Sequence, residues 1–227
     1  MIKKTQIEIA ILIFLIINIL LSYKVDLTIY NYFSNLNFGF QTDYLKKFFV
    51  SITKLGDSLW YFLIIFSFFL LSFFGNKTKL ISVKKCLYLK NLTYFSFFYL
   101  VLVGLITQLL KHIIGRPRPN YVDVNSDTGF NFFSTDASFH SFPSGHSSTI
   151  FAIALILSLM LPGLRVFFFL FAFIVAISRV VVGAHFTTDI LAGGLLAIIL
   201  YKIFLVFLEK RFLFITVQNV TIKNTSL

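Results

Sequence analysis

Polar residues that could bind and transfer a phosphoryl group gather in three short clusters of this sequence. The clusters are Lys111 with Arg118-Pro119, then Pro143-Ser144-Gly145-His146, and then Ser178-Arg179 with His185 and Asp189. They lie between apolar stretches that could each cross a bilayer, where an ionisable side chain costs several kcal/mol and usually serves a function. Their cations, histidines and carboxylate are the groups that metal-free phosphoryl transfer through a histidine would use.

His185 and Asp189 are four positions apart, a spacing that places two side chains on one face of a helix. The carboxylate can then accept a hydrogen bond from one imidazole nitrogen and leave the other nitrogen available as a nucleophile. Gly183, in the turn before His185, permits backbone conformations that a bulkier residue would resist. The same pair could instead cap a transmembrane helix through local hydrogen bonds, and the spacing is compatible with both roles.

The second cluster directly precedes an apolar stretch and is expected to begin a helix. The first N–H groups of a helix are unpaired and carry the positive end of its dipole, so this position suits a phosphate. We expect Ser144 to cap the helix or donate to a phosphate oxygen, and Gly145 to let a ligand approach the main chain. His146 can supply the proton that a departing alkoxide needs. A helix cap with an unrelated histidine would have the same sequence.

Lys111 and Arg118 are seven positions apart, nearly two turns of a helix. We expect Pro117 and Pro119 to end that helix, with Arg118 just beyond its last turn. Two neighbouring cations can bind an anion together, and the guanidinium can donate hydrogen bonds to two phosphate oxygens. Basic residues at the ends of membrane spans also commonly reach lipid headgroups. Arg116 is assigned to that second role and left outside the site.

The composition indicates a polytopic membrane protein. Of the 227 residues 58% are hydrophobic and 31 are Phe, and the mean hydropathy is +0.88, values that soluble domains rarely reach. Six apolar stretches approach the roughly 20 residues that a bilayer core requires, which predicts an all-α membrane helix bundle with six transmembrane helices. The stretches are Ile7–Ser22, Leu59–Phe74, Leu92–Ile114, His146–Leu161, Val166–Val182 and Ile190–Leu208. We interpret the first as an uncleaved anchor, because no small-residue cleavage site follows it.

The formal net charge of +11 is explained by membrane topology and does not predict a nucleic-acid partner. Lys and Arg concentrate in the cytoplasmic loops of membrane proteins, and this bias is best satisfied here with both termini in the cytoplasm. All three clusters then lie on the external face. There, Lys24–Asp57 mixes aromatic and charged residues, which predicts a short amphipathic segment in the membrane interface. We expect residues 1–227 to form a single membrane domain.

The three clusters together resemble a known family signature. The pattern Lys-x6-Arg-Pro, Pro-Ser-Gly-His, Ser-Arg-x5-His-x3-Asp is similar to the tripartite signature of the type-2 phosphatidic-acid phosphatases, which are integral membrane lipid phosphate phosphatases. Every fixed position of the signature is filled in this sequence. The signature region, Lys111–Asp189, covers 79 of the 227 residues, and the six-span layout extends the resemblance to most of the chain.

The resemblance implies a role for each residue of the signature. His185 would attack phosphorus and form a phosphohistidine, with Asp189 orienting the ring. His146 would protonate the leaving oxygen and then activate the water that cleaves the intermediate. The residues that would bind the phosphoryl oxygens are Lys111, Arg118, Ser144, Gly145 and Arg179. The resemblance implies no metal ion and no other cofactor.

The expected partner is a phosphorylated membrane lipid. The family includes phosphatases for phosphatidic acid, phosphatidylglycerol phosphate, polyprenyl diphosphate and lipid A. The small size and short loops favour the bacterial inner membrane, and hence an envelope lipid such as polyprenyl diphosphate, lipid A or phosphatidylglycerol phosphate. One alternative is a phosphotransferase that passes phosphate from a polyprenyl diphosphate to a lipid sugar such as lipid A. Another is a non-catalytic lipid transporter, which would not explain the two histidines.

Overall fold

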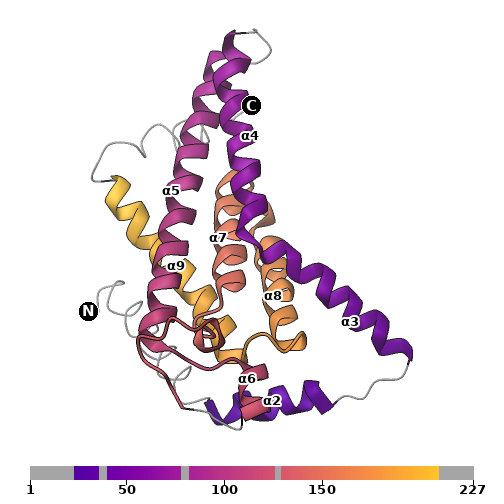
Figure 1. Cartoon of the computed structure of the whole chain (residues 1–227). Coiled ribbons are helices and arrows are strands. Elements are labelled where there is room, and N and C mark those ends of the chain that lie inside the picture. The colour runs from indigo at the N-terminus through magenta and orange to yellow at the C-terminus, as the bar shows by residue number, and fades with distance from the viewer. Residues whose placement is uncertain (1–22, 36–39, 78–81, 126–128, 210–227) are drawn as a thin grey trace, which may run out of the picture.

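The computed structural model describes residues 23–35, 40–77, 82–125 and 129–209, and within these ranges it is helical with no strand (Figure 1). The eight α-helices are α2 (Tyr23–Asn35), α3 (Phe40–Thr53), α4 (Ser58–Lys77), α5 (Val83–Ile114), α6 (Pro119–Asn125), α7 (Gly145–Met160), α8 (Arg165–Val181) and α9 (Thr187–Glu209). Three short 3₁₀ turns join them, at Lys54–Gly56, Ala137–Phe139 and Pro162–Leu164. The predicted all-α fold is confirmed. The predicted first span, Ile7–Ser22, lies outside the described residues.

Among the described residues, four largely helical segments are long and apolar enough to cross a membrane. They are Ser58–Gly75, Val83–Val122, Pro162–Val181 and Thr187–Leu208. Helix α7 is apolar but only 16 residues long, shorter than the roughly 20 residues that span a bilayer. The structure therefore confirms an apolar helical bundle typical of a membrane protein, while the predicted number of six spans is not confirmed.

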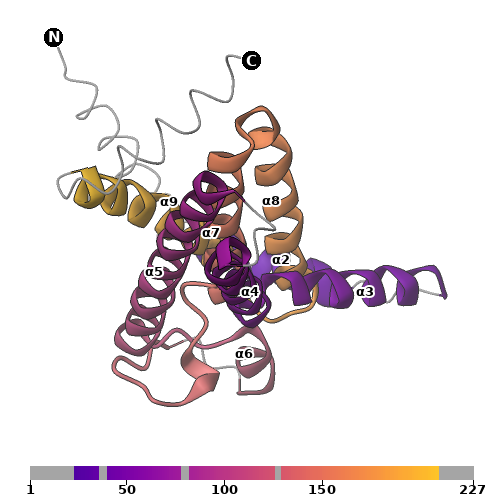
Figure 2. The same cartoon turned by 90° about the horizontal axis from the view of Figure 1, so that it is seen from above.

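Helix α7 lies at the centre of the bundle and packs against α5, α8 and α9 (Figures 1 and 2). Its face toward these helices is lined by small and branched apolar residues, including the buried Ala152, Ile153 and Ala154. Tyr99 of α5 is fully buried, and its hydroxyl donates a 2.7 Å hydrogen bond to the carbonyl of Ala197 in α9. This bond satisfies the one polar atom of the tyrosine side chain and ties α5 to α9 across the core.

The helix ends that carry the three clusters lie at the same end of the bundle. The last turn of α5, the first turn of α7, the last turn of α8 and the first turn of α9 meet at the lower end in Figure 1. Helix α2 packs against α8 and α9 at this end, while α3 begins away from the bundle and reaches it at its C-terminal end, where it contacts α8. The bundle thus brings the three clusters, from Lys111 to Asp189, together at this end.

Candidate active site

The first cluster lies where α5 ends. Gly115 adopts the left-handed conformation with a φ of 57°, and its N–H donates a 3.0 Å hydrogen bond to the carbonyl of Lys111. Glycine commonly ends helices in this way because it has no side chain to clash. Arg118 lies beyond the last turn of α5, as expected, but the helix already ends at Ile114, before either proline.

His185 lies in the turn between α8 and α9. Because α9 begins only at Thr187, the prediction that His185 and Asp189 share a helix face is wrong. Gly183 turns the chain with a φ of 73°, and the N–H of His185 donates to the carbonyl of Arg179 at 3.2 Å. This tight turn still brings Nδ1 of His185 to 3.6 Å from Oδ2 of Asp189, within the range of an ion pair but longer than a hydrogen bond.

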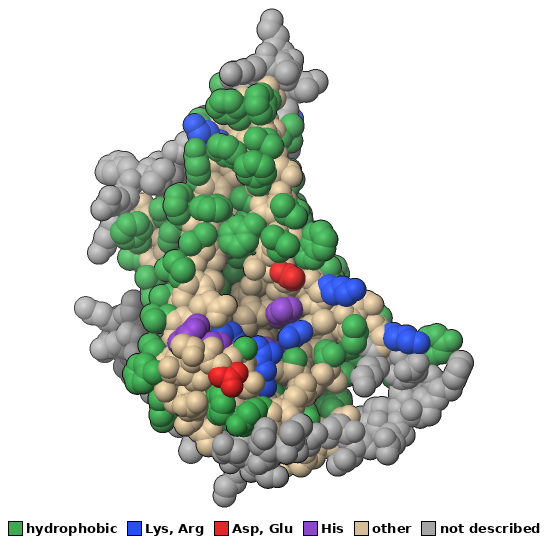
Figure 3. All heavy atoms as spheres, viewed as in Figure 1, with side chains coloured by type: hydrophobic (Ala, Val, Ile, Leu, Met, Phe, Trp, Pro, Cys, Tyr) green, Lys and Arg blue, Asp and Glu red, His purple; other side chains and the backbone are tan. Residues whose placement is uncertain are grey.

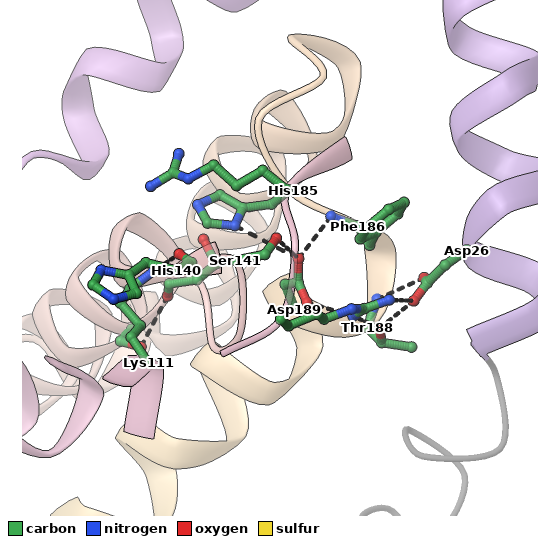
Figure 4. A network of polar contacts seen from close by, with 12 residues as sticks. Asp26, Lys111, His140, Ser141, His185, Phe186, Thr188 and Asp189 are labelled. Carbon is green, nitrogen blue, oxygen red and sulfur yellow. Dashed lines mark hydrogen bonds and ion pairs between the residues drawn. The ribbon is translucent and has the colours of Figure 1, made fainter. Parts of the chain in front are cut away.

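The buried carboxylate of Asp189 accepts hydrogen bonds from three directions (Figure 4). Its Oδ2 accepts from the hydroxyl of Ser141 at 2.6 Å and from the N–H of Phe186 at 2.9 Å, and its Oδ1 accepts from Arg116 at 2.5 Å. The bond to Phe186 places a carboxylate in the first turn of α9, where the helix dipole favours negative charge. Asp189 therefore caps α9 and faces His185 at the same time.

Ser144 occupies the N-cap position of α7, but its hydroxyl makes no capping bond. The hydroxyl oxygen is buried and has no partner among the described residues, which leaves a donor available inside the site. The N–H of Ser144 donates a 3.0 Å bond to the backbone carbonyl of Asp189. A Cβ atom on Gly145 would lie 3.9 Å from Cε of Lys111, so the start of α7 lies beside that lysine. A helix N-terminus, a hydroxyl and a cation thus converge here.

The three predicted phosphate-binding cations lie near His146. Lys111, Arg118 and Arg179 each interact electrostatically with this histidine, which lies in the first turn of α7. Within the part of the chain that the structure describes, none of the three forms an ion pair with a carboxylate. Their positive charge is therefore not cancelled by direct pairing, and the site favours an anion.

Neutral oxygens hold these cations in place. Nζ of Lys111 donates a 2.6 Å bond to the carbonyl of His140, and Arg118 donates from Nε to the carbonyl of Ala137 at 3.0 Å. Arg179 donates a 2.8 Å bond to the hydroxyl of Thr53 at the end of α3. These acceptors fix the side chains while leaving other N–H groups of the ammonium and guanidinium groups for a ligand.

His146 also lines a cavity of about 420 Å³. The cavity combines polar side chains, such as Asp57 and Gln108, with apolar ones, such as Phe62 and Leu105. Gly56 packs directly against the histidine, because a Cβ atom at this glycine would lie 2.7 Å from Cβ of His146. Figure 3 shows histidine and basic side chains gathered on this face, below a largely hydrophobic surface. The cavity therefore suits an amphiphilic ligand, which has a polar and an apolar part.

The interpretation of Arg116 as a headgroup-binding side chain is wrong. Arg116 is only 3% exposed and bonds to Asp189, to Oδ2 of Asp26 at 2.8 Å and to the hydroxyl of Thr188 at 2.7 Å. Sequence reasoning missed Arg116, and it also missed Asp26 and Ser141, because their partners are distant in the sequence. The one signal in the sequence was that Asp26 and Arg116 lie in segments predicted to be on the same side of the membrane as Asp189.

Burial lowers the pKa of His185 to about 3, because the low-dielectric interior disfavours the charged imidazolium. Lys111 and Arg179 lower this pKa further, while the carboxylate of Asp189 opposes the shift. The ring is therefore neutral at physiological pH and retains a nitrogen lone pair. A neutral buried imidazole facing a carboxylate can act as a nucleophile once a phosphate binds to the nearby cations.

The chain is also similar to known proteins. The sequence model of the PAP2 superfamily matches residues 93–213. The chain is 38% identical over 147 residues to the lipid A 1-phosphatase of Rhizobium johnstonii and 39% identical over 148 residues to that of Rhizobium etli. Both alignments cover 63% of this chain, and they cover 59% and 62% of the two relatives. The chain thus aligns with less than two thirds of the length of these relatives.

The structure is also similar to a solved one. The crystal structure of a transmembrane PAP2 type phosphatidylglycerolphosphate phosphatase from Bacillus subtilis superposes with a TM-score of 0.62 at 26% sequence identity. The superposition covers 89% of this chain and 96% of that protein. The likeness therefore extends over nearly the whole helical bundle, beyond the segment that carries the three clusters.

Proposed function

This chain belongs to the PAP2 superfamily, and we propose that it is a membrane-bound lipid phosphatase that works through a phosphohistidine. The observation that carries the proposal is the position of His185. Its Nδ1 lies 3.6 Å from the carboxylate of Asp189, and the same end of the bundle holds three cations with no carboxylate partner among the described residues. A nucleophile, its orienting carboxylate and an anion site are therefore together.

In the first step, Nε2 of His185 attacks phosphorus while Asp189 faces the opposite ring nitrogen. The bond between phosphorus and the lipid oxygen breaks, and this oxygen takes up a proton from His146, whose protonated form the negative charge of the bound phosphate would favour. In the second step His146 accepts a proton from water, the hydroxide attacks the phosphohistidine, and inorganic phosphate leaves with His185 restored. No atom beyond the lipid, water and these side chains is required.

The phosphoryl oxygens carry the charge that develops during both steps. Lys111, Arg118 and Arg179 would neutralise that charge, which is the largest catalytic contribution in most phosphoryl transfers. The unpartnered hydroxyl of Ser144 would donate to one oxygen, and the N–H groups at the start of α7, beginning at Gly145, would bind another.

The proposed substrate is an envelope lipid with a phosphate on its headgroup, and lipid A with a 1-phosphate is the leading candidate. The support is the 38–39% identity to two lipid A 1-phosphatases, over alignments that cover 63% of this chain. The cavity beside His146, part polar and part apolar, suits a lipid that keeps its tails in the membrane. We propose that the site opens on the external face of the bacterial inner membrane, with both termini in the cytoplasm.

The test is phosphate release by the purified protein from a panel of lipids: lipid A, phosphatidylglycerol phosphate, phosphatidic acid and a polyprenyl diphosphate. We expect release that continues in EDTA and is lost in His185→Ala, with that variant still inserted and folded. Dependence on a metal, or full activity without His185, would contradict the mechanism.

Product analysis with a labelled polyprenyl diphosphate, with and without lipid A as acceptor, separates hydrolysis from phosphotransfer. Absence of release from every lipid would favour the non-catalytic transporter.

A further inference from the structure

We infer that Arg116 and Asp26 are positioning residues that hold the carboxylate of Asp189 against His185. The inference rests on the proposed phosphatase function, and it concerns residues that lie outside the three clusters. Neither side chain contacts the reacting atoms in this arrangement. Both would act through Asp189, which bonds to Arg116 and faces His185.

Arg116 is held on several sides. Its guanidinium bonds to Oδ1 of Asp189 at 2.5 Å and to Asp26 at 2.8 Å, and its carbon lies 4.4 Å from the centre of the Phe186 ring. A planar guanidinium can bond to two carboxylates and lie over an aromatic ring at once, which an ammonium group cannot do. Because Arg116 bonds to Oδ1, the other oxygen, Oδ2, is the one that faces His185.

Asp26 comes from α2, far from the clusters in the sequence, and is 1% exposed. Its Oδ1 accepts a 2.9 Å bond from the N–H of Thr188, and its Oδ2 accepts from the Thr188 hydroxyl and from Arg116 (Figure 4). Tyr30, one turn further along α2, packs edge-on against the Phe186 ring with 6.1 Å between centroids. Helix α2 is therefore anchored to the first turn of α9, directly beside the site.

The charges explain why an aspartate is needed here. Arg116 alone would cancel the charge of Asp189 and weaken its interaction with the imidazole as the ring gains positive charge during attack on phosphorus. With Asp26 present, the group of two carboxylates and one guanidinium keeps a net negative charge next to His185. Buried charges that lack a partner are costly, so the three groups also stabilise one another in one arrangement.

The decisive variant is Asp26→Asn, which keeps the shape of the side chain and removes its charge. Rapid-quench measurements with lipid A carrying a ³²P-labelled 1-phosphate would follow formation of the phosphoenzyme. We expect this rate and kcat to fall about tenfold or more, while KM stays within about twofold, because Asp26 is buried and would not touch the lipid. Arg116→Lys should act in the same direction. The matched control is Arg165→Lys, since Arg165 also lies over a phenylalanine ring but is remote from the site.

Thr188 gives a second test that does not depend on a buried charge. Thr188→Val removes the hydroxyl that joins Asp26 to Arg116 and should lower kcat, whereas Thr188→Ser keeps the hydroxyl and should restore it. Unchanged phosphoenzyme formation in folded Asp26→Asn, or equal kcat in Thr188→Val and Thr188→Ser, would overturn this inference while the phosphatase function stands. If the unaltered protein released no phosphate from any lipid, the proposed function and this inference would both fail.

Discussion

The N–H of Ser144 donates a 3.0 Å hydrogen bond to the backbone carbonyl of Asp189, so the second and third clusters are joined through their main chains. One residue starts α7 and the other lies in the first turn of α9. Gly193 lies one turn further along α9 and also faces Ser144. A Cβ atom on Gly193 would lie 2.5 Å from the carbonyl oxygen of Ser144. The two helices can approach this closely only because Gly193 has no side chain.

The first prediction follows from that contact. Gly193→Ala should push the start of α7 away from α9, because the nearest atom is the main-chain oxygen of Ser144, which cannot rotate aside. We expect loss of most lipid phosphatase activity together with a lower thermal unfolding midpoint. Gly163→Ala is the matched control, because a Cβ atom there meets nothing within 4 Å. Full activity in folded Gly193→Ala would show that the helix contact does not position the site.

The second prediction concerns Ser141, which no sequence pattern identified. Its hydroxyl donates a 2.6 Å bond to Oδ2 of Asp189, the oxygen that faces His185. Ser141→Ala removes one of two donors to that oxygen, and a hydrogen bond to a charged group contributes about 1.5–3 kcal/mol. We expect kcat to fall about tenfold or more with little change in KM.

The control for Ser141→Ala is Ser158→Ala, which removes a hydroxyl that bonds only within α7, to the carbonyl of Ala154 at 2.6 Å. Steady-state kinetics with a phosphorylated lipid in detergent micelles would compare the two variants. Equal kcat values in both would mean that Ser141 does not influence Asp189.

The apolar helices could be predicted from the sequence because a bilayer requires long continuous apolar segments. The predicted spans Leu59–Phe74 and His146–Leu161 begin within one residue of α4 and α7. The start of α5 was predicted at Leu92 but lies at Val83, because the lysines in the first turns are good helix formers that an apolar pattern does not count. Hydrophobicity thus locates the core of a helix better than its polar end.

The contacts among the polar residues were less predictable. Arg116 bonds to Asp26 and to Asp189, which are 90 and 73 positions away in the sequence, whereas spacing rules describe only neighbours along a helix. The turn at His185 shows the same limit. Its four-residue spacing to Asp189 suggested a helix, but the left-handed Gly183 turns the chain and α9 starts two residues after the histidine.

The third prediction is a pH dependence of stability. Burial holds the pKa of His185 at about 3 in the folded protein, whereas an unfolded histidine has a pKa of about 6.5. Between these values the unfolded chain binds one more proton than the folded one, so stability falls as the pH is lowered. This single group should cost about 2 kcal/mol on going from neutral pH to pH 5.

The measurement is the thermal unfolding midpoint in detergent from pH 7.5 to pH 5. His185→Gln removes the titrating ring, so its midpoint should decline less over the same range. Parallel curves for the two proteins would contradict a neutral, buried His185. The comparison does not depend on catalysis, so it tests the burial of the histidine separately from its proposed role as nucleophile.

The last prediction concerns α3, which we expect to lie in the membrane interface and which contacts the site through its last residue. Its final residue, Thr53, accepts the hydrogen bond from Arg179, while Tyr44 and Phe48 are 62% and 53% exposed. Exposed aromatic side chains at a membrane surface lie at the level of the headgroups. The double variant Tyr44→Ser, Phe48→Ser should therefore shift the relative rates on different phosphorylated lipids in vesicles. Phe48→Trp, which keeps an interfacial aromatic ring, should preserve these ratios, and unchanged ratios in the serine variant would remove α3 from lipid selection.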